Sequence, residues 1–318
     1  MLKIDRRAAL AASLAGVLAP AAWAQEIVRF VVPFPAGGAL DVVGRILADS
    51  MREQLAANLV VENRPGVNGN LGAAFVAKAE PDGNTLLVTQ DGVVTVNPAL
   101  FKGNAINPNE LVAIGPIAYQ PSVLVVSATS PWRTLDEFVR HARGAEVTYS
   151  SPGIGSIAHL IMAYFAGQAG LKALHVPYAV GPRAIAAIMS GEVDCSFLAF
   201  GNAISQIKSG KVRALGVSSL KRMPQVPEAP TIAEQNFPGF ELNQSYLLMG
   251  PARLPRPRRE RIAGALFKAL ESPDVVKRLR DLGMEPAARI SDEQLQANLT
   301  DMGRRWTTVI QRHNITAN

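Results

Sequence analysis

The chain has 318 residues, of which 48% are hydrophobic, and its formal net charge at pH 7 is +6. This size and apolar content are sufficient for two lobes with separate cores. The charge excess is mild, and the densest basic stretch, 253–261, is interrupted by prolines and has no aromatic residue that stacks on bases. We therefore expect no nucleic-acid partner.

The first 24 residues have the pattern of a secretory signal. Three basic residues within the first seven positions precede an apolar run over 8–19, and Ala22-Trp23-Ala24 supplies small residues for cleavage. The run is shorter than the roughly 20 residues that span a membrane, and Pro20 interrupts it. We expect cleavage after Ala24 and a soluble periplasmic protein of charge about +4, exported by the general or the twin-arginine route.

From residue 26 onward, short β-branched runs alternate with helical periodicity, which predicts a mostly parallel sheet flanked by helices. The first unit has expected strands at 27–32, 59–62 and 85–89 and helices at 40–55 and 71–79. The second has strands at 123–127, 147–150, 193–197 and 214–218, and helices from Thr134 and at 157–169, 183–190 and 204–209. A Pro-rich connection leads to a strand at 245–250 and to helices at 257–271, 273–282 and 292–312.

This order predicts two lobes. The chain is expected to cross into the second lobe near Leu124 and to return near Leu248, so that lobe 1 comprises 25–124 and 249–318, and lobe 2 comprises 125–248. Two crossings make a hinge, and the cleft between hinged lobes is a preferred place for a small ligand.

Two glycine-bearing turns are candidates for anion binding. Loop 1 (33–41) and loop 2 (151–156) each follow a strand and directly precede a helix. Backbone N–H groups at a helix N-terminus are unpaired and carry partial positive charge, which favours a carboxylate or a phosphate. We therefore expect one loop from each lobe to present free N–H groups to an anion held between them.

Two residues of loop 1 allow two interpretations each. Phe34 either forms a wall of the ligand pocket or packs in the core at the end of a strand. Asp41 either complements the helix dipole or contacts a ligand amine, hydroxyl or water. Loop 2 resembles a dinucleotide fingerprint through Gly153 and Gly155, but the stretch 172–178 offers no acidic residue for a ribose, so no cofactor is expected.

Catalysis and metal binding have little support. The four histidines show no metal-binding spacing, and the Gly-x-Ser-x-Gly pattern of a nucleophilic serine is absent from the sequence. Ser156 lies three residues before His159 without an orienting acid, so it is interpreted as a helix N-cap or a ligand donor. The single cysteine, Cys195, excludes an intramolecular disulfide and is expected to be buried.

Several segments together resemble the substrate-binding proteins of tripartite tricarboxylate transporters, the Bug (Bordetella uptake gene) family. The similarity covers essentially the whole mature chain. The segments are Pro33-Phe34-Pro35-Ala36-Gly37-Gly38 with Asp41, Val60 to Gly72, Pro81 to Leu87, Asn97-Pro98, Gly153 to Ser156 with His159-Leu160, His175 to Tyr178, Gly191 to Asp194 and Gly210 to Leu215.

The resemblance implies a type II periplasmic-binding-protein fold, in which two α/β lobes joined by crossing hinge strands close over a small carboxylate. It implies delivery of the carboxylate to integral-membrane transporter subunits, with no catalysis and no metal, and closing lobes fit a monomer. The ligand-binding residues that it indicates are Phe34, Ala36, Gly37, Gly38, Asp41, Thr89, Asn97, Gly153, Gly155 and Ser156.

The chain also departs from the family pattern. Leu40 and Ile154 are larger and more apolar than the residues usual at these positions, which favours a monocarboxylate with an apolar or aromatic body, or a small dicarboxylate. A periplasmic sensor that presents a carboxylate to a signalling receptor needs the same cleft and stays open as an alternative. An exported hydrolase or lyase would instead turn the carboxylate over.

Overall fold

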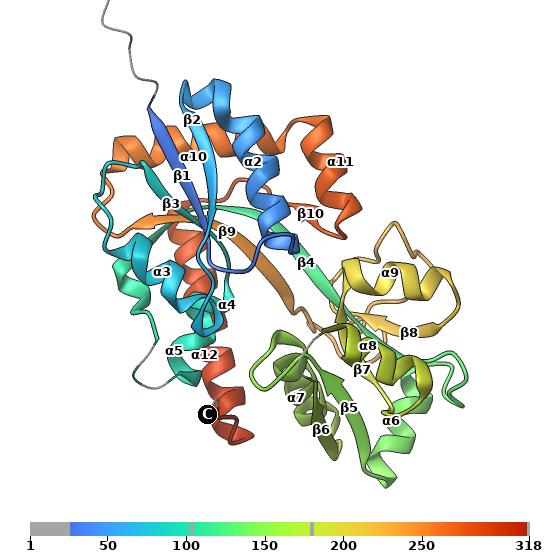
Figure 1. Cartoon of the computed structure of the whole chain (residues 1–318). Coiled ribbons are helices and arrows are strands. Elements are labelled where there is room, and N and C mark those ends of the chain that lie inside the picture. Colours follow the sequence, from blue (N-terminus) through green and yellow to red (C-terminus); the bar gives the residue numbers. More distant parts are fainter. Residues whose placement is uncertain (1–25, 102, 104, 179–180, 317–318) are drawn as a thin grey trace, which may run out of the picture.

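The computed structural model describes residues 26–101, 103, 105–178 and 181–316, and it consists of two α/β lobes joined by crossing strands (Figure 1). The predicted signal peptide, 1–24, lies outside the described residues.

Lobe 1 begins with a parallel arrangement in which β1 lies between β2 and β3. β3 then pairs with the returning strand β9 in antiparallel orientation. The elements before the crossing are β1 (Ile27–Val32), α2 (Ala39–Leu55), β2 (Asn58–Asn63), η1 (Val67–Gly69), α3 (Asn70–Ala77), β3 (Thr85–Gln90), α4 (Gly92–Thr95), α5 (Asn97–Leu100) and η2 (Pro108–Glu110). After the return they are β9 (Asn243–Pro251), α10 (Arg256–Leu270), α11 (Pro273–Asp281), β10 (Glu285–Pro286) and α12 (Asp292–Arg312).

Lobe 2 has a parallel pair, β5 with β6, and two strands, β7 and β8, that pair antiparallel with β4. Its first helix starts where expected, because Thr134 and Glu137 form a capping box. The elements are α6 (Leu135–Gly144), β5 (Val147–Ser151), α7 (Ile157–Ala169), β6 (Ala173–Pro177), α8 (Gly181–Ser190), β7 (Ser196–Ala199), α9 (Phe200–Lys208) and β8 (Val212–Val217).

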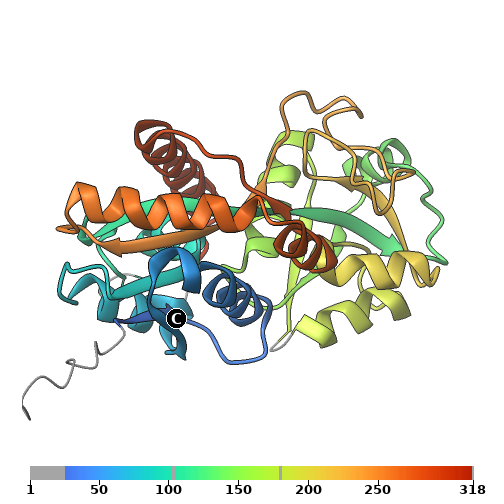
Figure 2. The same cartoon turned by 90° about the horizontal axis from the view of Figure 1, so that it is seen from above.

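The strand β4 (Leu111–Ser127) runs through both lobes (Figure 2). Its residues up to Pro121 pair with β9, and those from Ser122 onward pair with β7 and β8. The sequence analysis predicted only the second part, because prolines normally interrupt a central strand. Here Pro116 lies where the register shifts at a bulge. The expectation of a mostly parallel sheet is wrong, since every pairing made by β4 and β9 is antiparallel.

Ser218 links the two crossing segments next to the point where β4 stops pairing with β9 and begins pairing with β7. Its hydroxyl accepts a hydrogen bond from the Ser122 N–H and donates one to the Leu242 carbonyl, both at 2.8 Å. The side chain is fully buried, so these bonds are not exchanged with water. The hinge is therefore a hydrogen-bonded junction.

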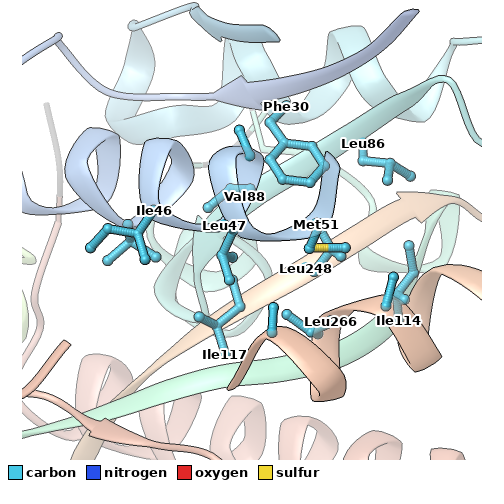
Figure 3. Packing of buried hydrophobic residues seen from close by; sticks show 14 of the residues in the cluster. Phe30, Ile46, Leu47, Met51, Leu86, Val88, Ile114, Ile117, Leu248 and Leu266 are labelled. Carbon is cyan, nitrogen blue, oxygen red and sulfur yellow. The ribbon is translucent and has the colours of Figure 1, made fainter. Parts of the chain in front are cut away.

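The core of lobe 1 lies between the sheet and helices α2 and α10 (Figure 3). The inward face of α2 contributes Ile46, Leu47 and Met51, which meet strand residues such as Phe30 and Leu248. This is the apolar face that the helical periodicity predicted for 40–55.

The last helix, α12, packs on both lobes. Near its start Leu295 belongs to a lobe 1 cluster with Leu247, whereas Trp306 and Val309 belong to a cluster that contains most of the lobe 2 core. Trp306 is only 2% exposed. A rigid helix anchored in this way connects the lobes in addition to the two crossing strands.

Candidate functional site

Loop 1 is organised by the carboxylate of Asp41, whose side chain is 4% exposed. It accepts hydrogen bonds from the Gly37 N–H, from the Arg45 guanidinium at two nitrogens and from the Asn63 amide, each at 3.0 Å. The bond from Arg45 holds the pKa of Asp41 below its usual value of 3.8. All four bonds lie within the protein, so Asp41 orders the loop that leads into α2.

The rest of loop 1 has backbone available for a ligand. Residues 35–39 are exposed, and Gly37 adopts a positive φ of 81° with open space where a Cβ would lie. Within the described chain, the N–H group of Ala36 has no hydrogen-bond partner, and the Gly38 N–H faces the Pro35 carbonyl across the turn at 36–37. Both lie at the N-terminus of the 17-residue helix α2, where partial positive charge favours an anion.

In loop 2 the N–H groups are already engaged. The Gly153 N–H donates to the Ser151 hydroxyl, the Gly155 N–H donates to Nδ1 of His159, and the Ser156 N–H donates to the Gly153 carbonyl. The expectation of free N–H groups is therefore wrong for these three residues, and also for Gly37 in loop 1. Ser156 is the N-cap of α7, one of the two roles expected for it, with its hydroxyl accepting from the His159 N–H at 3.4 Å.

Two stacked histidines lie beneath loop 2. The rings of His159 and His175 are 3.8 Å apart between centroids, and the Tyr149 ring lies beside both, 5.0 Å from His175 and 6.0 Å from His159. Burial lowers the pKa of His159 to about 3, with a further contribution from His175, and burial alone lowers that of His175 to about 4. Both rings are neutral at pH 7, and the proton of His159 lies on Nε2, since Nδ1 accepts the Gly155 N–H.

Ser156 and His159 are three residues apart in the sequence, but the structure pairs another serine with another histidine. The Ser151 hydroxyl lies 2.7 Å from Nε2 of His175. Ser151 is fully buried and its hydroxyl also bonds to the backbone of Gly153, so it is not presented to a substrate. This proximity follows from the β5–β6 register, which places Tyr149 beside His175.

Thr89 and Asn97 are both fully buried. The amide of Asn97 donates to the Asn68 carbonyl and to the Asn70 side chain, and its oxygen accepts from the Asn68 amide. Thr89 makes a 3.3 Å bond to the neighbouring carbonyl. Both side chains are therefore hydrogen-bonded to the protein itself.

A chain of contacts places parts of both loops at one boundary between the lobes. The ring of Phe34 lies 3.3 Å from the position that a Cβ on Gly69 would take. Gly69 is flanked in the sequence by Asn68 and Asn70, which both bond to Asn97. Asn97 begins α5, and Leu100 at the end of that helix contacts Gly155 of loop 2. Phe34 is half-buried and packs against two lobe 1 core clusters, and its backbone carbonyl accepts a hydrogen bond from Asn63.

The contact between Gly155 and Leu100 makes a testable prediction. Gly155→Ala should lower the free energy of unfolding by about 2–4 kcal/mol, because φ is +75° and the new Cβ would lie 2.1 Å from Leu100. Gly170→Ala is the matched control, since φ is +69° with open space, and it should cost only about 1 kcal/mol. Urea unfolding measures both changes, and Leu100→Ala should recover part of the loss at Gly155. Equal losses in the two glycine variants would contradict the contact.

Other kinds of site are not indicated in the described part of the chain. It has no group of three or more histidine, cysteine and acidic side chains suited to a metal ion, and Cys195 is fully buried as a free thiol. Among the described helices, none combines the length and the apolar composition that crossing a membrane requires.

Comparison with known proteins places this two-lobed fold among receptors for solutes. The sequence profile of the family described as "Tripartite tricarboxylate transporter family receptor" matches residues 43–315. A UPF0065 protein from Pseudomonas sp. strain P51 is 36% identical over 294 residues, which are 92% of this chain and 87% of that protein. The chain thus belongs to the tripartite tricarboxylate transporter receptor family, and the resemblance seen in its sequence is confirmed.

Solved structures agree with this assignment. The periplasmic binding protein BugD superposes with a TM-score of 0.75 at 30% identity, covering 92% of this chain and 98% of BugD. An R. palustris protein solved with adipate superposes with a TM-score of 0.78 at 26% identity, covering 92% of this chain and 99% of that one. The predicted fold, two α/β lobes of the periplasmic-binding-protein type, is confirmed.

Proposed function

We propose that this protein captures a small carboxylate between its lobes in the periplasm and delivers it to the membrane subunits of a tripartite tricarboxylate-type transporter, without chemical turnover. The observation that carries the proposal is the exposed backbone of 35–39 at the N-terminus of α2, with the N–H group of Ala36 free. Membership of the receptor family supports the transport role. The signal peptide, cleaved after Ala24, and a monomeric state are part of the same proposal.

In this proposal a carboxylate contacts loop 1 first. The N–H groups of Gly153, Gly155 and Ser156 become available only if loop 2 exchanges its internal hydrogen bonds for the ligand. Such an exchange accompanies lobe movement about a hinge at Pro121–Ser122 and Leu242–Asn243, a few residues before the crossings predicted from the sequence. The residues 25–121 and 243–318 then form lobe 1, with α12 packing on both lobes.

The ligand class that we propose is an apolar or aromatic monocarboxylate or a small dicarboxylate. Ile154 at the tip of loop 2 is 50% exposed, so the loop offers apolar surface beside its backbone. The related R. palustris protein was solved with adipate, which has an aliphatic body between two carboxylates.

The test is to purify the protein from periplasm, identify the small molecule released from it by mass spectrometry, and measure binding of a carboxylate panel by calorimetry. We expect adipate-like or benzoate-like acids to bind more tightly than citrate, and the bound acid to be recovered unchanged. Binding of tricarboxylates alone would refute the ligand class, and a converted acid would refute the absence of turnover. Co-purification with a sensor kinase instead of a permease would favour the sensor alternative.

A further inference from the structure

A cavity of about 740 Å³ lies at the hinge. Tyr119 of β4 and Ser245 of β9 line it from the two crossing strands, Leu299 lines it from α12, and the segment 219–224 lines it from lobe 2. None of the ten predicted ligand-binding residues is part of its wall. Its volume falls within the range of small-molecule sites, which often lie where domains meet.

One end of the cavity contains a buried carboxylate. Asp91, which directly precedes α4, is 4% exposed, and the backbone N–H groups of Ser245 and Gly92 near its carboxylate lower its pKa. Burial nevertheless raises the pKa of Asp91 to about 7. Of the ion pairs formed in the described ranges, none involves Asp91 or the neighbouring wall residue Glu241.

The charges around Asp91 leave this end of the cavity negative. Burial, Glu241 and Asp91 together raise the pKa of the Tyr119 phenol, and burial and Asp91 raise that of Tyr246, so both phenols stay neutral and add no charge.

The basic side chains of the wall do not neutralise Asp91. Arg305 pairs with Asp301, Arg222 pairs with Glu234 outside the cavity, and Lys221 is exposed at the rim. An ionised Asp91 thus lacks a cation, which a bound ligand can supply.

Another part of the cavity wall is apolar. Leu247 and Leu295 are buried at 0% and 5% exposure, and Leu299 and Met302 continue this surface along α12. An aliphatic group against these side chains removes apolar surface from water, at about 25 cal/mol for each Å² buried.

We propose that this hinge cavity is a second small-molecule site, which binds an organic ammonium ion with a short aliphatic body. The ammonium group lies against Asp91, and the aliphatic chain lies against Leu295 and Leu299. Because both lobes line the cavity, its occupant prefers one lobe arrangement, and its binding is therefore coupled reciprocally to binding in the cleft. This site goes beyond the proposed carboxylate capture and does not depend on it.

The experiment titrates n-hexylammonium chloride into the full mature chain by calorimetry. At pH 8 we expect saturable binding, and we expect Asp91→Asn to weaken it at least tenfold. Binding to the unmodified protein should also weaken several-fold at pH 6, where Asp91 is protonated. Asp274→Asn, which removes an exposed carboxylate on α11 outside the cavity wall, is the matched control and should bind as the unmodified protein does. n-Hexanol, which lacks the charge, should bind no more tightly than n-hexylammonium binds to Asp91→Asn.

A second variant tests the apolar wall independently of Asp91. Leu299→Phe should obstruct the cavity and weaken n-hexylammonium binding several-fold, and circular dichroism establishes that each variant is folded. Equal affinities of the unmodified protein and Asp91→Asn would overturn the proposal. Equal affinities for n-hexylammonium and n-hexanol, or no saturable binding at millimolar concentrations, would overturn it as well.

Discussion

Asp41→Ala is expected to lower the free energy of unfolding by about 3 kcal/mol and to weaken carboxylate binding at least tenfold. The substitution removes the acceptor of four hydrogen bonds and leaves the Gly37 N–H and the Asn63 amide without it. Hydrogen bonds to charged groups contribute about 1.5–3 kcal/mol each. The pair with Arg45 is discounted because that side chain is 53% exposed. Binding weakens because loop 1 loses the bond that fixes Gly37.

The control for this variant lies on the same helix. Asp49 is 61% exposed, and its ion pair with Arg52 is long, at 3.8 Å. Asp49→Ala should therefore change the free energy of unfolding by less than about 0.5 kcal/mol. Urea unfolding gives the stabilities, and calorimetry with the acid recovered from the purified protein gives the affinities. If Asp41→Ala behaved like Asp49→Ala in both measurements, Asp41 would not organise loop 1.

Most elements could be predicted from the sequence because their causes are local. Helices such as α2 and α7 show an apolar stripe or a capping serine, and glycine turns separate them from buried strands. The full length of β4 could not be predicted, because Pro116 and Pro121 suggest an interruption, and only the bulge and the pairing with β9 explain why they are tolerated.

The C-terminal helix shows a second limit. The apolar residues of α12 follow helical spacing along its whole length, which predicts a buried face but not what covers it. Leu295 packs in lobe 1, and Trp306 packs against lobe 2. These contacts depend on how the two lobes are placed in the folded chain, which the helical spacing does not reveal.

The candidate site was predictable as a pair of loops but not in its hydrogen bonding. The pattern of glycines before a helix indicates N–H groups near an anion site, but the same N–H groups are within reach of side chains four residues later. The Asp41 carboxylate accepts the Gly37 N–H in this way, and Nδ1 of His159 accepts the Gly155 N–H. The stacking of His159 on His175 depends on the parallel register of β5 and β6, which spacing along the chain does not reveal.

The histidine pair predicts that acid destabilises the protein. Both pKa values are lowered in the folded state, to about 3 and about 4, from the usual histidine value of 6.5. Between pH 6.5 and those values the unfolded chain binds more protons, so the free energy of unfolding falls as pH falls. Each pKa unit corresponds to about 1.4 kcal/mol, and allowing for the partial exposure of His175 we expect the two histidines to contribute a loss on the order of 3–5 kcal/mol between pH 7 and 4.5.

Two conservative variants isolate this effect. His159→Asn keeps an acceptor near the position of Nδ1 for the Gly155 N–H, and His175→Gln keeps a polar group near Nε2 for Ser151. The double variant should lose at least 2 kcal/mol less than the unmodified protein over the same pH range. His141→Gln, which removes an exposed histidine on α6, is the control and should follow the unmodified protein.

Comparison between variants is necessary because Asp91 acts in the opposite direction. Its pKa is raised to about 7 in the folded state, so the folded protein binds more protons than the unfolded chain between pH 4 and 7, and Asp91 favours folding as pH falls. This contribution is common to the unmodified protein and the histidine variants, and it cancels in their difference. Urea unfolding at pH 7, 6, 5 and 4.5 measures that difference, and parallel stability curves for the double variant and the unmodified protein would show that the buried histidines do not cause the loss.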